Sequence, residues 1–98
     1  MNEEKPNILL VEDEIHLARG ICFNLELEGY RVSHVETGEE ALQKLEYDRF
    51  SLIILDIMLP GMDGFTVCKK IRESDMRVPI LILSARSEEG DRVTGLSA

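Results

Sequence analysis

The chain has 98 residues, 44% of them hydrophobic, and its 19 acidic and 11 basic side chains give a net charge of −8. This size and composition fit one globular domain over residues 1–98. They exclude a membrane span, because no apolar run approaches the roughly 20 residues that a span needs. The acidic balance argues against nucleic-acid binding by this domain, since phosphate contacts need clustered lysine and arginine side chains.

The first six residues are polar and lack the apolar stretch of a signal peptide, so we expect the protein in the cytoplasm. Cys22 and Cys68 fall on predicted helix faces, and they form no C-x-x-C motif. We expect both to be buried free thiols of a reducing compartment. A disulfide or a two-cysteine redox site is the alternative.

The first third of the chain predicts a helix between two strands. Residues 7–11 read as a strand, and residues 14–28 read as a helix, because their apolar side chains recur at helical spacing. Gly29 stands where a left-handed residue ends a helix. Residues 30–35 alternate between apolar and polar side chains, which predicts a half-buried strand at an edge of the sheet.

The middle of the chain predicts a second helix and a fully buried strand. Thr37 and Glu40 have the spacing of a capping box, from which a helix runs to about residue 47. Residues 52–55 are apolar throughout, as in a strand that is buried on both faces, and the run ends at Asp56. Pro60-Gly61 then predicts a turn.

The last third continues the alternation. Asp63 is expected to cap a helix over residues 64–73, followed by a strand over 80–83 and a short helix over about 88–96. Strands that alternate with helices predict an α/β fold, with a parallel sheet covered by helices on both faces and right-handed crossovers.

Acidic side chains follow two of the predicted strands at the points where the strands end. Glu12 and Asp13 follow the first strand, and Asp56 ends the third. If these strands are parallel neighbours, the carboxylates meet at the edge of the sheet where α/β proteins bind ligands. Two unit charges about 4 Å apart repel by about 4 kcal/mol at an effective dielectric constant of 20, so the cluster needs compensation. A hard divalent cation such as Mg²⁺ would supply it.

Three segments carry a resemblance to a known family. They are ILLVEDE at residues 8–14, LIILDIMLPGMDG at 52–64 and PILILSA at 79–85. In this order and spacing they resemble the receiver domain of bacterial two-component response regulators, over about residues 7–98. The likeness is greatest to the subgroup with a winged-helix DNA-binding output domain.

The resemblance implies a flavodoxin-like, doubly wound parallel sheet with strand order 2-1-3-4. It also implies that the family's fifth strand and helix, with a lysine that pairs with the phosphoryl group, are missing after Ala98. The domain is therefore expected to be incomplete at its C-terminus. The strand over residues 80–83 would then be an open apolar edge, through which we expect self-association or strand exchange.

The resemblance also assigns roles to residues. Asp56 would accept a phosphoryl group from a histidine kinase, and Mg²⁺ would be held by Glu12, Asp13, Asp56 and the backbone carbonyl of Met58, with Glu12 bound directly or through water. Ser84 would donate a hydrogen bond to the phosphoryl group and move towards it, switching an attached effector domain that controls transcription. The domain would be a signalling switch and not an enzyme, with at most weak self-dephosphorylation.

Simpler roles remain open for these residues. Asp56 could be a turn or capping residue, Asp13 could be only an N-cap, and Ser84 could be only a cap or turn residue. The phosphohistidine of the implied transfer belongs to the kinase, so His16 and His34 are expected to be exposed polar residues without a role.

Two other functions compete with the signalling switch. A metal-dependent phosphohydrolase would use Asp56 as its nucleophile, but it would want a general acid or base nearby, and Met58 stands two residues later. A nucleotide or flavin module would share the architecture. The turn over residues 12–14 lacks the glycines that admit a phosphate, however, and its charge would repel one.

Overall fold

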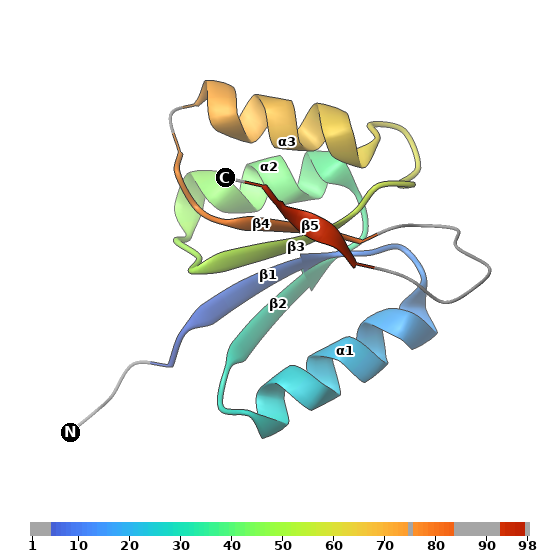
Figure 1. Ribbon diagram of the computed structural model, residues 1–98, viewed down its shortest axis with the longest axis vertical. Coiled ribbons are helices and arrows are strands. Elements are labelled where there is room, and N and C mark those ends of the chain that lie inside the picture. Colours follow the sequence, from blue (N-terminus) through green and yellow to red (C-terminus); the bar gives the residue numbers. More distant parts are fainter. Residues whose placement is uncertain (1–4, 75, 84–92, 98) are drawn as a thin grey trace.

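The computed structural model describes residues 5–74 and 76–83, and the backbone of 93–97. The structure contains one five-stranded sheet with the strand order β2-β1-β3-β4-β5, and Figure 1 labels all five strands. The strands are β1 (Asn7–Val11), β2 (Arg31–Val35), β3 (Leu52–Asp56), β4 (Ile80–Leu83) and β5 (Val93–Ser97).

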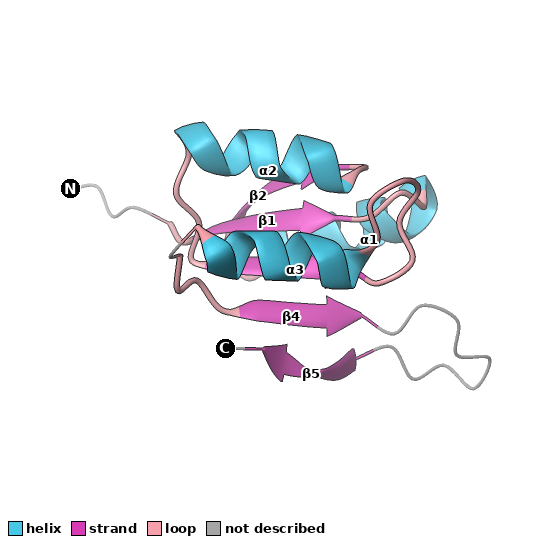
Figure 2. Cartoon of the chain, turned by 90° about the horizontal axis from the view of Figure 1, so that it is seen from above, coloured by secondary structure: helices cyan, strands magenta, loops and turns pink. Residues whose placement is uncertain are grey.

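The first four strands are parallel, which confirms the predicted order 2-1-3-4 of a flavodoxin-like fold. Helix α1 (Ile15–Leu27) covers one face of the sheet, and α2 (Gly38–Tyr47) and α3 (Gly64–Glu73) cover the other (Figure 2). Each face has its own apolar core, because β1 and β3 are buried on both sides and send alternate side chains to each.

The helix ends follow the capping chemistry that the sequence predicts. Thr37 Oγ1 accepts a hydrogen bond from the Glu40 N–H (3.1 Å), and Glu40 Oε1 accepts from the N–H of Glu36 (2.9 Å), one residue before the cap. Asp63 Oδ1 accepts from the Thr66 N–H (2.8 Å), so this carboxylate caps α3 as expected.

Strand β2 lies at an edge of the sheet, as its alternating pattern predicts. Gly29 precedes it with a φ of 97°, a left-handed conformation that glycine adopts without strain, so the predicted end of α1 is confirmed.

The predicted fourth helix is wrong over residues 93–97. Here the backbone forms β5, which pairs antiparallel with β4 in a register that joins Ile82 to Gly95. Val93 and Thr94 are β-branched, and Gly95 is a poor helix former, so local propensity favours a strand, and the edge of β4 offers backbone groups for it to pair with. The edge of β4, expected to be open, is therefore paired. Residues 88–92 of the predicted helix lie outside the described part of the chain.

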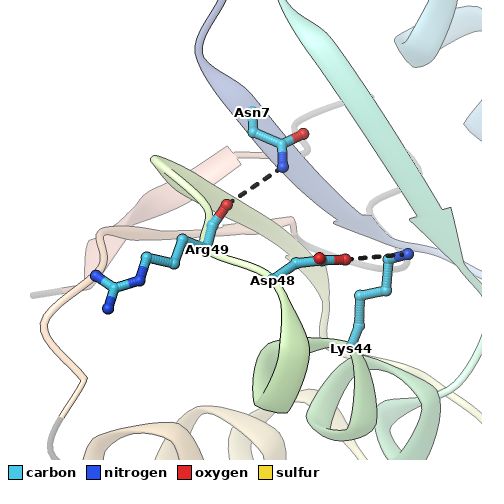
Figure 3. Close-up of polar contacts among 4 residues, drawn as sticks. All are labelled: Asn7, Lys44, Asp48 and Arg49. Atoms are coloured by element: carbon cyan, nitrogen blue, oxygen red, sulfur yellow. Dashed lines mark hydrogen bonds and ion pairs between the residues drawn. The ribbon is translucent and has the colours of Figure 1, made fainter. Parts of the chain in front are cut away.

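Side chains and backbone groups tie together the amino ends of the strands, at the opposite end of the sheet from Asp56. Asn7 Nδ2 donates to the carbonyl of Arg49 (3.2 Å), and the Ser51 N–H donates to the carbonyl of Asn7 (2.8 Å). Lys44 and Asp48 form an ion pair at 3.3 Å at the end of α2 (Figure 3). Both of these side chains are partly exposed, so we expect the pair to contribute well under about 1 kcal/mol.

The two cysteines are free thiols, as expected, and both are half-buried. Cys22 packs against the core on the α1 face, and Cys68 packs against the core on the opposite face. The sheet between them prevents a disulfide between these two residues. No helix in the described part of the chain is both long and apolar enough to cross a membrane.

Candidate metal and phosphoacceptor site

The parallel pairing of β1 with β3 places three carboxylates at one edge of the sheet. Val11 lies opposite Leu55 in the register, so the next residues along the two strands, Glu12 and Asp56, are neighbours. Asp13 joins them, and one carboxylate oxygen from each of the three residues lies within 4.8 Å of the other two. The sequence-based prediction that these acidic residues meet is confirmed.

Glu12 is the most deeply buried of the three, with only 2% of its surface exposed. Its Oε2 accepts a hydrogen bond from the Glu14 N–H (3.0 Å), whereas its buried Oε1 has no hydrogen-bond partner in the described structure. A buried carboxylate oxygen without a partner is costly, and a cation would supply one.

The environment of Glu12 also changes its acidity. Burial raises the pKa of its carboxyl from an ordinary value of 4.5 to about 7, although the hydrogen bond from Glu14 acts in the opposite direction. The negative charges of Asp56 and Asp13 raise this pKa as well. Without a cation, the Glu12 carboxyl is therefore partly protonated near neutral pH.

Asp56 ends β3 and keeps 8% of its surface exposed. Its Oδ1 accepts a hydrogen bond from the N–H of Met58 (3.2 Å), which fixes the turn after the strand. The Gly64 N–H donates to the carbonyl of Ile57 (2.8 Å) and brings the start of α3 against this turn. A Cβ at Gly64 would lie 2.5 Å from the Asp56 carbonyl oxygen, so this approach requires glycine.

Asp13 is exposed, and it is not the N-cap of α1. Glu14 is the N-cap, since its Oε1 accepts from the Leu17 N–H (2.9 Å). The simpler reading of Asp13 as a helix cap is therefore wrong.

Position 34 differs from expectation. His34 is half-buried, and its Nε2 lies 2.7 Å from the backbone carbonyl oxygen of Glu12. The contact follows from the register, because His34 lies opposite Leu10 and its ring reaches the residue just beyond the end of β1. The sequence offers a weak signal: a histidine stands near the end of the strand that is predicted to neighbour β1. His16 is exposed, as expected.

Ser84 lies outside the described residues, so its predicted hydrogen bond to a phosphoryl group stays a prediction. The same holds for the backbone carbonyl of Met58 as a metal ligand. The Met58 N–H already contacts Asp56, and the Met58 side chain is half exposed.

The donor set fits a hard divalent cation. It offers only carboxylate oxygens, which Mg²⁺ prefers, and Asp13 is exposed to water. The partnerless Glu12 oxygen and the mutual repulsion of three carboxylates both favour cation binding.

Comparison with known proteins identifies the family. A sequence model of the response regulator receiver domain matches residues 8–98. PhoP of Bacillus subtilis, the alkaline phosphatase synthesis transcriptional regulatory protein, is 47% identical over 89 residues, which are 91% of this chain and 37% of PhoP. PhoB of Rhizobium meliloti, the phosphate regulon transcriptional regulatory protein, is 43% identical over 94% of this chain and 41% of PhoB. The chain thus spans about two fifths of these relatives.

Solved structures of response regulators are similar to this chain in fold. The response regulator TrrA of Thermotoga maritima, solved in complex with Mg²⁺-BeF, has a TM-score of 0.79 and 36% identity over 87% of this chain and 74% of its own. The chemotaxis response regulator CheY4 of Vibrio cholerae has a TM-score of 0.79 and 32% identity over 87% and 72%. On its sequence and its fold, the chain belongs to the response regulator receiver domain family.

Proposed function

We propose that this domain accepts a phosphoryl group from a histidine kinase onto Asp56, with Mg²⁺ bound beside it. The observation that carries the proposal is the meeting of Asp56 with Glu12 and Asp13 at the tips of two parallel strands, within 4.8 Å. An aspartate is a competent phosphoryl acceptor once the charges around it are neutralised.

Each residue of the site has a distinct part in this proposal. Glu12, Asp13, Asp56 and the Met58 carbonyl hold Mg²⁺, which offsets the negative charge of the acceptor and of the incoming phosphoryl group. A carboxylate oxygen of Asp56 attacks phosphorus, forming a P–O bond, while the P–N bond to the kinase histidine breaks and its electron pair returns to the imidazole. The Met58 N–H orients the Asp56 carboxylate for this attack.

Ser84 is the proposed link from phosphorylation to output. Its hydroxyl donates a hydrogen bond to the aspartyl phosphate, and the loop after β4 moves with it. The relatives named above are transcriptional regulators, and they are longer than this chain. An attached effector, a winged-helix DNA-binding domain, is therefore the proposed receiver of the signal.

The domain acts on itself and not on outside phosphoesters. A hydrolase would want a general acid or base beside Asp56, and the residue two positions later is Met58, whose side chain cannot transfer a proton. Slow loss of the phosphoryl group to water is the only turnover that we propose.

Intact-mass measurement tests the proposal. We expect one phosphoryl group to be added when the protein is incubated with a small-molecule phosphodonor and Mg²⁺, and none without Mg²⁺. Asp56→Asn should abolish the addition. Asp63→Asn is the matched control, because this carboxylate caps α3 and should be dispensable for the reaction. Labelling of Asp56→Asn at the wild-type level would refute the assignment.

A further inference from the structure

Strand β2 holds the residue after β1 at two points. The Glu12 N–H donates to the carbonyl of Val35 (3.0 Å), and the imidazole of His34 contacts the Glu12 carbonyl oxygen at 2.7 Å. The first contact continues the ladder of the sheet. The second is made by a side chain, so it depends on the identity of residue 34.

The chemistry of the acceptor fixes the direction of this hydrogen bond. A carbonyl oxygen can only accept, so Nε2 of His34 carries the hydrogen and donates it. The bond is short for an N–H···O contact, and it is partly buried, so water replaces it poorly if the ring is removed.

The bond acts on the backbone of a residue of the acidic cluster. With its N–H and its carbonyl both held by β2, Glu12 has little freedom to rotate its peptide planes. Its carboxylate is held by the Glu14 N–H (3.0 Å), and one of its oxygens lies within 4.8 Å of oxygens of Asp13 and Asp56. Release of the carbonyl would loosen the turn that carries both Glu12 and Asp13.

We propose that His34 is a positioning residue for the cation pocket: its Nε2–H holds the Glu12 carbonyl from β2, so that Glu12 and Asp13 face Asp56. His34 itself touches neither the cation nor the phosphoryl group. It can play this part only if the pocket binds a cation, as proposed above. Groups that orient metal ligands from behind typically change metal affinity by about 10- to 100-fold when they are removed.

Two substitutions at position 34 separate the donor from the bulk of the ring. Gln carries an amide N–H at a reach close to that of imidazole Nε2, whereas Leu has a similar size and no donor. His16→Leu is the matched control, because His16 is an exposed histidine on α1.

The experiment titrates each protein with Mg²⁺ and follows the backbone amide NMR signals of Asp13 and Asp56. We expect His34→Leu to weaken Mg²⁺ binding by about tenfold, and His34→Gln and His16→Leu to stay within about twofold of wild type. Rescue by Gln is the result that a purely space-filling role would not produce. Wild-type binding by His34→Leu, or equal loss in Leu and Gln, would overturn the positioning role.

A measurement on the wild-type protein covers the case in which His34→Leu does not fold. Long-range ¹H–¹⁵N correlation should show the His34 ring with its hydrogen on Nε2 and protected from exchange. A ring protonated only on Nδ1 would overturn the inference. Failure of the wild-type protein to bind Mg²⁺ would overturn both the proposed function and the positioning role. If the wild-type protein binds Mg²⁺ and only the results for the position 34 variants differ from those expected, the positioning role alone is overturned.

Discussion

At the scale of one residue, the surroundings of Glu12 favour the binding of a cation. Its carboxylate is almost fully buried and lies among two other acidic groups, so its charged form is unfavourable in the free protein. The buried charge of Glu12 therefore destabilises the folded protein at neutral pH, and a bound divalent cation would remove this effect. Either a proton or a bound metal would relieve the repulsion, so the two should compete for the site.

The stability of the free protein should depend on pH through this residue. Its pKa rises from 4.5 to about 7 on folding, so the folded state holds the proton more tightly than the unfolded state does. The associated stability is complete below about pH 4.5 and is lost as the pH rises through about 7. A shift of this size corresponds to an upper limit of about 3 kcal/mol. We expect Glu12→Gln, which stays neutral, to lose less stability over this range.

Urea unfolding in a chelating buffer, at pH values from 5 to 8, measures this difference. Glu14→Gln is the control, because this neighbouring carboxylate is exposed and an amide oxygen can also accept its capping hydrogen bond from Leu17. Parallel pH profiles for wild type and Glu12→Gln would contradict the prediction.

At the scale of elements, the strand tips were predictable and the last element was not. Continuous apolar runs and the acidic residues that end them predicted β1, β3 and the meeting of Glu12 with Asp56, because parallel strands end at one edge. The helix predicted over residues 93–97 was wrong. This short segment has weak helical spacing, so pairing with the edge of β4 determines its structure. The His34 contact depends on register and ring direction, which no local pattern encodes.

Replacement by alanine should have opposite effects on stability at Gly64, the first residue of α3, and at Gly20, inside α1. A Cβ at Gly64 would lie 2.5 Å from the Asp56 carbonyl oxygen and 2.7 Å from the Ile57 Cα, so the start of α3 must move away from the site. We expect Gly64→Ala to destabilise the domain by about 1–3 kcal/mol and to weaken Mg²⁺ binding. Gly20 is exposed in α1, with nothing within 4 Å of an added Cβ, so Gly20→Ala should stabilise by about 0.5–1 kcal/mol.

Thermal and urea unfolding of the two variants, each with and without Mg²⁺, tests this pair. Both variants replace a helical glycine by alanine, so the difference between them does not include the general effect of that replacement. A Gly64→Ala protein as stable as Gly20→Ala would show that the contact between α3 and the turn after β3 is loose.

At the scale of the whole molecule, the sheet has two chemically different ends. The carboxyl ends of β1 and β3 carry the acidic cluster. At the amino ends, Asn7 bonds to the carbonyl of Arg49 (Figure 3) and accepts a hydrogen bond from the Ser51 N–H. Repulsion within the cluster adds to that of a net charge of −8. A cation at this one edge should therefore stabilise the entire domain, because binding to the folded state alone shifts the unfolding equilibrium.

We expect Mg²⁺ at ten times its dissociation constant to stabilise the wild-type domain by about 1.4 kcal/mol. NaCl at the same ionic strength should give much less, since it screens charge without occupying the site. Asp56→Asn should be more stable than wild type in the absence of Mg²⁺, because one repelling charge is gone, and should lose most of the gain from Mg²⁺. Thermal unfolding in matched salts measures all three effects. Equal stabilisation by Mg²⁺ and NaCl would mean that the cluster acts only through general charge repulsion and holds no specific ion.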